Sequence, residues 1–210
     1  MDPALEKYVL SHSDEEDQLL CELSRQTHLK YVNPRMVAGH LQGKILEMIS
    51  KMIRPSTILE IGTFTGYSTI CLAKGLTGEG IMHTIEINDE LEDFTTSWFV
   101  KAGLADKIKL HLGDALSLIP QLNYSFDLVF IDGEKNEYSA YYNLVFDKVR
   151  PGGFILADNV LWSGKVVTEA NRPDGSTRGI LEFNEMVLND KRVEKVIFPL
   201  RDGLTIIRKK

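Results

Sequence analysis

The 210-residue chain has few of the features that mark secreted, membrane or zinc-binding proteins. Its two cysteines, Cys21 and Cys71, are too few for a disulfide framework or a zinc site. Both fall in segments predicted to be helical, and we expect them to be buried small hydrophobic residues. No apolar run approaches the ~20 residues that cross a bilayer, and residues 1–17 carry no signal-peptide pattern. We therefore expect a cytoplasmic protein with no membrane partner.

The chain also lacks the positive charge that marks nucleic-acid-binding proteins. Its net charge is −6, whereas general attraction to phosphate requires clustered Lys and Arg. Internal repeats, low-complexity tracts and Pro/Gly/Ser-rich linkers are absent too. A hydrophobic content of 43% and a charged content of 26% are typical of a globular protein. We expect one domain over residues 1–210, with a helical N-terminal cap at 1–54 and an α/β core at 55–210.

The N-terminal third is predicted to be helical. Ser13 and Glu16 have the spacing of a capping box, which predicts a helix over residues 14–27. A second helix is expected over residues 35–53, between Asn33-Pro34 and Arg54-Pro55.

From residue 57 onward, short apolar runs alternate with helical stretches. Strands are expected at 57–61, 81–87, 107–112, 127–131 and 153–158, and helices at 65–76, 88–102, 115–122 and 136–149. This alternation is typical of a parallel sheet with helices on both faces. After a helix at 181–189, two apolar runs flank Arg201-Asp202-Gly203, which predicts a hairpin. The expected fold is a doubly wound, Rossmann-like α/β fold with a seven-stranded, mostly parallel sheet and an antiparallel C-terminal hairpin.

An acidic residue ends each predicted parallel strand, and this is the main functional signal in the sequence. Ligands of doubly wound sheets bind outside the carboxyl ends of the strands, so these side chains should gather at one cleft. The acids, in strand order, are Glu60, Glu86, Asp114, Asp132 and Asp158, and Asn159 directly follows the last.

The loop after the first strand is glycine-rich without being a dinucleotide fingerprint. Gly62 and Gly66 form Gly-x-x-x-Gly, whereas pyrophosphate binding prefers Gly-x-Gly-x-x-Gly, and Glu60 would repel a pyrophosphate. Glu86 is placed to accept hydrogen bonds from a ribose diol, and Asp114 from an adenine amine. Ribose, adenine and a positive charge together indicate S-adenosylmethionine. The alternative is a tight strand-to-helix turn with no ligand.

Asp132, Asp158 and Asn159 supply two carboxylates and one amide oxygen at neighbouring strand ends. Oxygen-only donors favour a hard divalent cation, which we take to be Mg²⁺, with Ca²⁺ or Mn²⁺ as alternatives. Lys135 should face the same cleft, and beside a cation its lowered pKa would make it a usable general base. The alternatives are that each acid caps a helix and that Lys135 is a solvated surface residue.

Five other side chains are candidates for a role in or near the site. Trp162 and Tyr138 lie beside the proposed cation, where they would wall an aromatic acceptor or pack in the core. His83 and His111 fall within predicted strands, where packing is expected rather than metal ligation. Ser68 is outside any Gly-x-Ser-x-Gly elbow, so the sequence does not support a hydrolase triad.

Together these residues resemble the cation-dependent class I O-methyltransferases, the family that contains the catechol and caffeoyl-CoA O-methyltransferases. The resemblance covers residues 31–208, and the short 160–177 loop is similar to that of bacterial members. It rests on LEIGTFTGYST (59–69), TIEIN (84–88), LGDA (112–115), DLVFIDGEKNEY (127–138), PGGFILADNVLWSGKV (151–166), TRGILEFN (177–184) and DGLTI (202–206).

The resemblance implies a role for each residue of the predicted site and a homodimeric assembly. Asp132, Asp158 and Asn159 would hold Mg²⁺, Lys135 would be the general base, and Lys135, Asn159 and Trp162 would contact the acceptor. Glu86 would bind the cofactor ribose and Glu60 its methionine end. The remaining cofactor-binding residues would be Ala38, Gly62, Thr63, Ser68, Ile87, Asp114, Ala115 and Asp132. Gly133-Glu134 replaces the His-Trp of the animal catechol enzymes, so the acceptor pocket is expected to differ from theirs.

The expected function is Mg²⁺- and S-adenosylmethionine-dependent O-methylation of a small aromatic vicinal diol, such as a catechol or a caffeoyl ester. The alternative substrate, by resemblance to some bacterial relatives, is 5-hydroxyuridine in tRNA. For tRNA, the candidate phosphate contacts are Arg172, Arg178, Arg201 and residues 208–210. A nicotinamide-dependent oxidoreductase and a receiver-like signalling domain are the rival classes. The missing Gly-x-Gly-x-x-Gly opposes the first, and the positions of the acids and of Lys135 oppose the second.

Overall fold

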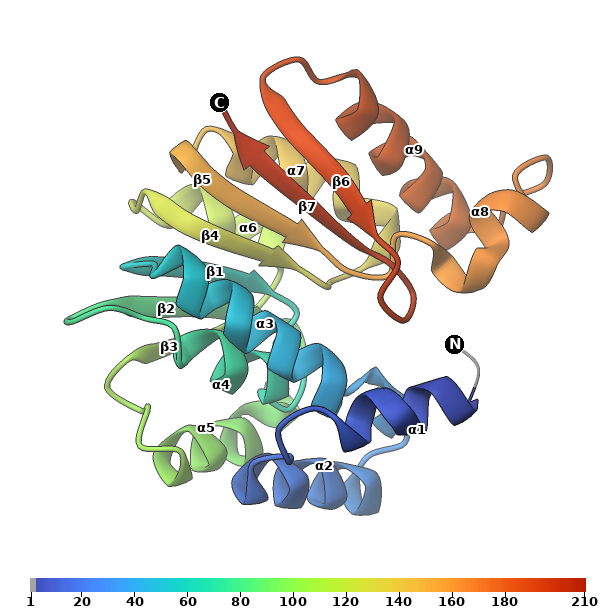
Figure 1. Ribbon diagram of the computed structural model, residues 1–210. Coiled ribbons are helices and arrows are strands. Elements are labelled where there is room, and N and C mark those ends of the chain that lie inside the picture. Colours follow the sequence, from blue (N-terminus) through green and yellow to red (C-terminus); the bar gives the residue numbers. More distant parts are fainter. Residues whose placement is uncertain (1–2) are drawn as a thin grey trace.

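In the computed structural model, which describes residues 3–210, seven strands form one sheet in the order β3-β2-β1-β4-β5-β7-β6 (Figure 1). Strands β1 to β5 are mutually parallel, β7 is antiparallel to β5, and β6 is antiparallel to β7. The predicted fold, including the C-terminal hairpin, is confirmed. The strands are β1 (Thr57–Ile61), β2 (Ile81–Glu86), β3 (Ile108–Leu112), β4 (Phe126–Ile131), β5 (Val149–Ala157), β6 (Val193–Phe198) and β7 (Leu204–Lys209).

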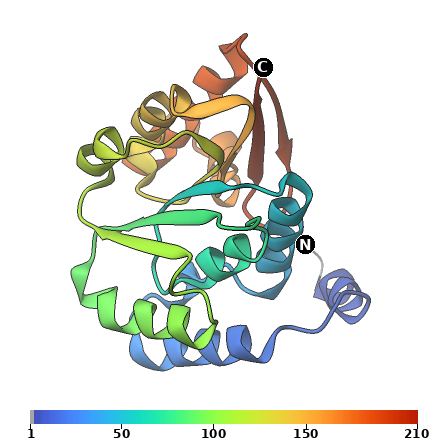
Figure 2. The ribbon, with the colours of Figure 1, turned by 90° about the vertical axis from the view of Figure 1, so that its left-hand side faces the viewer.

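Helices cover both faces of the sheet (Figure 2) and bury its apolar side chains in two clusters. One face packs against α2 (Gln18–Lys30), α3 (His40–Ile53), α4 (Tyr67–Ala73) and α5 (Glu92–Lys101). The other packs against α6 (Ala115–Leu118), α7 (Tyr138–Phe146) and α9 (Gly175–Asn189). The remaining elements are α1 (Pro3–Ser11), α8 (Lys165–Thr168) and the 3₁₀ helices η1 (Pro34–Met36), η2 (Asp89–Leu91), η3 (Ile119–Gln121), η4 (Lys135–Glu137) and η5 (Trp162–Gly164).

The central strands are mostly apolar and almost completely buried, because helices cover both of their faces. Every residue of β4 is buried, for example. Strand order reverses beside β1, whose neighbours are β2 on one side and β4 on the other. A doubly wound sheet opens a crevice at such a reversal, outside the carboxyl ends of the strands. The fold therefore directs the loops after β1, β2, β4 and β5 toward one place.

The N-terminal helices differ from the prediction. The predicted capping box at Ser13 is wrong: α2 begins at Gln18, because the Asp17 carboxylate accepts the Leu19 backbone N–H and caps the helix. Ser13 instead donates to the Val9 carbonyl oxygen behind α1, a helix that the sequence did not predict. Glu16 accepts a hydrogen bond from the Tyr67 hydroxyl.

Several other boundaries also change. The helix expected from residue 35 begins at His40, because the backbone turns at Gly39 with φ of 75°. Helix α9 begins at Gly175, six residues before the predicted start, where Asp174 caps it by accepting the Thr177 N–H.

Cys71 is buried as expected, whereas Cys21 is exposed, so the expectation for Cys21 was wrong. Within residues 3–210, none of the helices has the length and apolar character that a membrane span requires.

Candidate functional site

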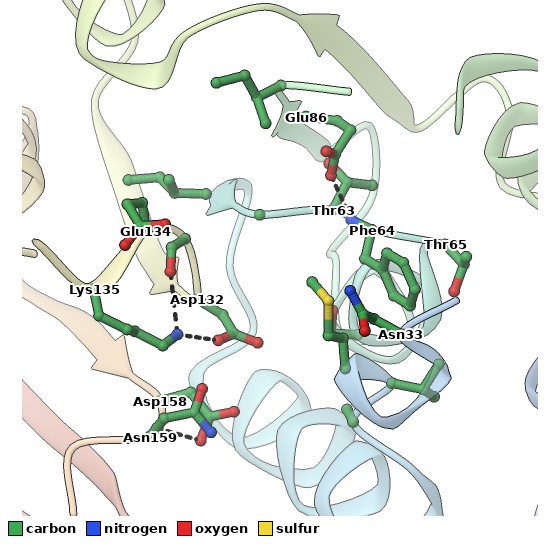
Figure 3. A pocket seen from close by; sticks show the side chains of 18 of the residues that line it. Asn33, Thr63, Phe64, Thr65, Glu86, Asp132, Glu134, Lys135, Asp158 and Asn159 are labelled. Atoms are coloured by element: carbon green, nitrogen blue, oxygen red, sulfur yellow. Dashed lines mark hydrogen bonds and ion pairs between the residues drawn. The ribbon is translucent and has the colours of Figure 1, made fainter. Parts of the chain in front are cut away.

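A cavity of about 1380 Å³ opens at the carboxyl ends of β1, β2, β4 and β5. Figure 3 shows Glu86, Asp132 and Asp158, at the ends of β2, β4 and β5, together with Lys135. All the predicted site residues except Glu60 line this cavity. They are Ala38, Gly62, Thr63, Ser68, Glu86, Ile87, Asp114, Ala115, Asp132, Lys135, Asp158, Asn159 and Trp162.

The glycine-rich loop after β1 holds the Glu86 carboxylate in place. Gly62 has φ of 97°, and a Cβ atom there would lie 2.3 Å from the Asp132 carbonyl oxygen, so both its conformation and its surroundings require glycine. The Phe64 N–H donates to one Glu86 oxygen at 2.7 Å, and the Asn88 N–H donates to the other at 3.0 Å. Each carboxylate oxygen keeps a further lone pair for a ligand. A pair of hydroxyls in the cavity can therefore bind Glu86 in a fixed orientation.

Glu60 lies in the interior beneath this loop, outside the set of residues that line the cavity. Its carboxylate accepts hydrogen bonds from the hydroxyls of Ser68, Thr69 and Thr84, at 2.6, 2.5 and 2.6 Å. Burial raises the pKa of Glu60 to about 7, although the three hydroxyls oppose this shift. Because Glu60 does not line the cavity, its position does not support the expected direct contact with the methionine group of the cofactor. Glu60 instead holds Ser68, which does line the cavity.

Asp114 caps the helix that follows it, the role considered as the alternative to ligand binding for the acids at the strand ends. One of its oxygens accepts the Leu116 N–H at 3.0 Å, and the other accepts the Ser117 hydroxyl at 2.7 Å. These bonds lower the pKa of Asp114, the Ser117 bond most. Asp114 is thus an ionised acceptor at the cavity wall as well as the cap of α6.

The carboxylates of Asp132 and Asp158 end the neighbouring strands β4 and β5. Withdrawal from water raises the pKa of Asp132, while the charges of Lys135 and Arg201 oppose the shift. Burial raises the pKa of Asp158 to about 7, and the negative charge of Asp132 adds to this effect. A proton or a cation at these carboxylates would offset the cost of burying their negative charge.

The donor set around these carboxylates suits a hard divalent cation. Asn159 follows Asp158 in the left-handed conformation, with φ of 56°, and the three side chains offer oxygen donors from two adjacent strand ends. Within residues 3–210, no three His, Cys, Asp or Glu side chains cluster in a metal-binding arrangement. The amide of Asn159 would thus be the third ligand, and water or a substrate would fill the remaining positions.

Lys135 is buried at this site rather than solvated at the surface. Its Nζ atom donates to Asp132 Oδ1 at 2.9 Å, to the Gly133 carbonyl at 3.1 Å and to the Tyr138 hydroxyl at 2.7 Å. The Tyr138 ring packs in the core, and its hydroxyl donates to the Asp158 carbonyl at 3.1 Å. The Trp162 ring centroid lies 5.9 Å from Lys135 Nζ. Of the two roles expected for these aromatic residues, Tyr138 has the one in the core and Trp162 has the one in the cavity wall.

Two residues that the sequence did not predict as part of the catalytic site complete this end of the cavity. Gln42 of α3 donates to Asp158 Oδ2 at 2.5 Å, and its amide oxygen accepts from Arg201 Nη1 at 2.8 Å. Arg201 Nη1 also donates to the Ala38 carbonyl. No local pattern could have found this chain of contacts, because Gln42 and Arg201 are 159 residues apart in the sequence.

The remaining candidate residues lie away from the cavity. His83 and His111 stack within the sheet, with 2.9 Å between Nδ1 and Nε2, and His83 is 1% exposed, as expected for a packing role. The C-terminal cations bind the protein itself. Arg208 pairs with Glu194, Lys209 donates to the Phe146 and Val149 carbonyls, and Lys210 donates to that of Lys191.

Comparison with known proteins gives consistent matches over nearly the whole chain. A model of the O-methyltransferase family matches residues 10–210. A caffeoyl-CoA O-methyltransferase of Eucalyptus gunnii is 34% identical, over 98% of this chain and 87% of the relative. The structure of the O-methyltransferase TomG from Streptomyces achromogenes in complex with S-adenosylmethionine superposes with a TM-score of 0.91 at 30% identity, covering 99% of this chain and 96% of TomG. An O-methyltransferase from Bacillus cereus in complex with S-adenosylhomocysteine gives the same TM-score and identity, covering 99% and 97%.

Proposed function

This chain belongs to the O-methyltransferase family and is an S-adenosylmethionine-dependent enzyme, and on that premise we propose that it methylates a hydroxyl of a small aromatic vicinal diol with the help of a divalent cation. Catechols and caffeoyl esters are the acceptor classes in question. The observation that carries the proposal is the position of Lys135 Nζ, 2.9 Å from Asp132, in the cavity that Asp158, Asn159 and Glu86 also line.

The cofactor would occupy the Glu86 end of the cavity. Both Glu86 oxygens are fixed by backbone N–H groups and keep lone pairs for the ribose hydroxyls. Ile87, 76% exposed at the cavity wall, offers an apolar surface for the adenine, and Asp114 offers it an acceptor. The other residues proposed for this part of the site are Ala38, Gly62, Thr63, Ser68, Ala115 and Asp132.

Asp132, Asp158 and Asn159 would hold the cation, for which Mg²⁺ is the first choice. When bound, it supplies positive charge that lowers the pKa of an acceptor hydroxyl. Lys135 would accept the proton of that hydroxyl at Nζ once its own ammonium proton has left to solvent, and Asp132 and Tyr138 hold Nζ in place. The acceptor oxygen then attacks the sulfonium methyl, the C–S bond breaks, and S-adenosylhomocysteine leaves.

Positioning contributes more than proton transfer in this mechanism. A near-attack geometry can lower the barrier by about 7–11 kcal/mol, whereas a general base contributes roughly 10²–10⁴-fold in rate. The rigid supports of Glu86 and Lys135 are therefore as important as the acid–base group itself. Trp162 and Asn159, on the loop after β5, would flank the acceptor ring.

The assembly we propose is a homodimer. Val196, Ile197 and Phe198 of β6 are 58%, 44% and 46% exposed at the edge of the sheet. The register places Val196 and Phe198 on the same face as Ile206 and Leu204 of β7. A second copy would cover this apolar edge. Sedimentation of the wild-type chain should give twice the monomer mass, and a Phe198→Glu chain should sediment as a monomer.

The acceptor class is tested by methyl transfer from labelled S-adenosylmethionine. The assay would compare 3,4-dihydroxybenzoate, caffeate and tRNA that carries 5-hydroxyuridine with the wild-type, Lys135→Ala and Asp158→Ala proteins. The wild-type protein should methylate the small diols. Either substitution should reduce this activity by at least about 100-fold. Transfer to tRNA alone, lost at moderate salt, would instead favour the hydroxyuridine substrate, because phosphate contacts are salt-sensitive.

A further inference from the structure

Arg201 is a cavity residue that the proposed methyl transfer leaves without a role. Among the described residues, three cations line the cavity: Arg35, Lys135 and Arg201. Lys135 is paired with Asp132, whereas the guanidinium of Arg201 forms no ion pair within residues 3–210. An unpaired guanidinium in a binding cavity is available to an anionic group of a ligand.

The structure holds this guanidinium in a fixed position. Arg201 sits in the turn between β6 and β7 in the left-handed conformation, with φ of 47°. The next residue, Asp202, anchors the turn to the loop after β5, since its carbonyl accepts the Leu161 N–H at 2.8 Å and its carboxylate accepts the Ser163 N–H. The side chain is anchored at its other end, because Nη1 donates to the carbonyl of Ala38 and to the amide oxygen of Gln42.

Most of the hydrogen-bonding capacity of Arg201 remains free. A guanidinium has five N–H donors, and both bonds made here start from Nη1. In the described part of the chain, Nε and Nη2 donate to no acceptor. The edge formed by Nε and Nη2 is the one that receives a carboxylate in two parallel hydrogen bonds. Arg35, by contrast, is an exposed cavity arginine with neither an anchor nor a partner in the described residues.

The position of Arg201 relative to Asp158 defines what kind of anion it can reach. Gln42 bridges the two residues: its amide oxygen accepts from Arg201, and its amide nitrogen donates to Asp158 at 2.5 Å. Two hydrogen bonds and one amide group therefore separate the guanidinium from the carboxylate proposed to hold the cation. Both residues line the same cavity, so an arm carried by an acceptor that is bound at Asp158 can reach the guanidinium.

We propose that Arg201 determines acceptor specificity by binding a carboxylate carried by the aromatic ring of the vicinal diol. This inference rests on the proposed function and names the substrate class more narrowly, as acidic catechols. Three acids compete with this assignment, because Glu134, Glu137 and Asp202 also line the cavity and would attract a cationic arm. An amine-bearing catechol therefore belongs in the test.

The test compares an acid with its size-matched neutral amide, and adds a catechol with a cationic arm. The ratio of kcat/KM for 3,4-dihydroxybenzoate to that for 3,4-dihydroxybenzamide would be measured for wild type and variants, with dopamine as the cationic counterpart. Calorimetric binding of the same ligands to the S-adenosylhomocysteine complex gives a second readout that needs no turnover. Arg201→Asn removes the guanidinium and tolerates the left-handed backbone, Arg201→Lys keeps the charge, and Arg35→Asn is the matched control.

In wild type the acid should be preferred over the amide. Arg201→Asn should reduce both the kinetic and the binding ratio by roughly 10-fold or more, the scale of a charge-assisted pair. Arg201→Lys should retain part of the preference, and Arg35→Asn should retain all of it.

Three results would overturn the proposal: a wild-type preference for dopamine, equal losses for acid and amide in Arg201→Asn, or a changed ratio in Arg35→Asn. Equal losses would show that Arg201 only positions Gln42. Failure of the proposed function can be told apart from failure of this inference. If the proposed function is wrong, unsubstituted catechol is not methylated either, and the ratio of binding affinities for acid and amide still decides the role of Arg201.

Discussion

The Nζ atom of Lys135 lies 2.7 Å from the hydroxyl oxygen of Tyr138, three residues further along the chain. Both side chains are buried, and the same hydroxyl donates to the Asp158 carbonyl at 3.1 Å. Tyr138 therefore connects the proposed general base to the end of β5, where the proposed cation ligands begin. The element that makes this possible is η4, whose single turn brings Lys135 back over β4.

Tyr138→Phe should lower kcat by roughly 10-fold, because it removes one of the three acceptors that position the Lys135 amine. The Kd of S-adenosylhomocysteine should not change, since Tyr138 lies outside the set of residues that line the cavity. Tyr142→Phe is the matched control, because the Tyr142 hydroxyl donates to Asp190 at 3.0 Å. Steady-state kinetics of both variants check this, and an equal loss in Tyr142→Phe would contradict the positioning role.

Glu86→Gln should weaken cofactor binding by about 10-fold or more, because the amide can no longer accept hydrogen bonds on both sides. Two backbone N–H groups, of Phe64 and Asn88, would face a side chain with one acceptor fewer. Calorimetry with S-adenosylhomocysteine measures the effect. Glu90→Gln is the control and should bind as wild type does, because the Glu90 side chain of η2 is exposed. Unchanged binding in Glu86→Gln would refute the ribose assignment.

Glu60→Gln should flatten the pH dependence of the free energy of unfolding. Burial raises the pKa of Glu60 from 4.5 to about 7 in the folded chain, so the folded state holds a proton that the unfolded state loses. Stability from this group is full below the unfolded pKa and declines as pH rises toward 7, by roughly 3 kcal/mol in all.

Chemical denaturation between pH 4 and 8, a range chosen to bracket both values, measures this effect. Asp132 and Asp158 titrate in both proteins, so the difference between the two curves isolates Glu60. Parallel curves for wild type and variant would contradict the assignment.

Gln42→Met should raise the Mg²⁺ concentration needed for half-maximal activity by about 10-fold, the lower end for loss of an outer-shell partner. The amide of Gln42 holds Asp158 Oδ2 at 2.5 Å, and methionine keeps the volume without the donor. Gln26→Met is the control, because Gln26 on α2 bonds only to Glu22 in the described chain. A Mg²⁺ titration of each protein decides, and identical midpoints would exclude a role for Gln42 in holding Asp158.

The fold and most of the cavity could be predicted from local signals. Alternating apolar runs and helical stretches indicated the strands, and the acids at the strand ends follow from where ligands bind in such sheets. The glycine-rich turn after β1 was also visible as Gly62 and Gly66 in Gly-x-x-x-Gly, and Gly62 has the positive φ that favours glycine. These features depend on residues close to one another in sequence.

Contacts between distant residues could not be predicted. Gln42 and Arg201 are in contact only because the fold brings helix α3 and the β6–β7 turn together beside Asp158. The sequence also could not decide between two residues that are both good helix caps, Ser13 and Asp17. In the structure Ser13 bonds to Val9 and Glu16 bonds to Tyr67, so Asp17 is the residue that caps α2. Glu60 has the position of a cavity acid, but its hydroxyl partners on α4 and β2 hold it in the interior.

The central claim is that Lys135 acts beside a cation held by Asp132, Asp158 and Asn159. Its most direct test is methyl transfer to 3,4-dihydroxybenzoate by the wild-type protein, first with EDTA and then after Mg²⁺ is restored, with calorimetric binding of S-adenosylhomocysteine measured in parallel. The account predicts that EDTA abolishes transfer, that Mg²⁺ restores it, and that cofactor binding persists throughout. Transfer at an undiminished rate in EDTA would contradict it.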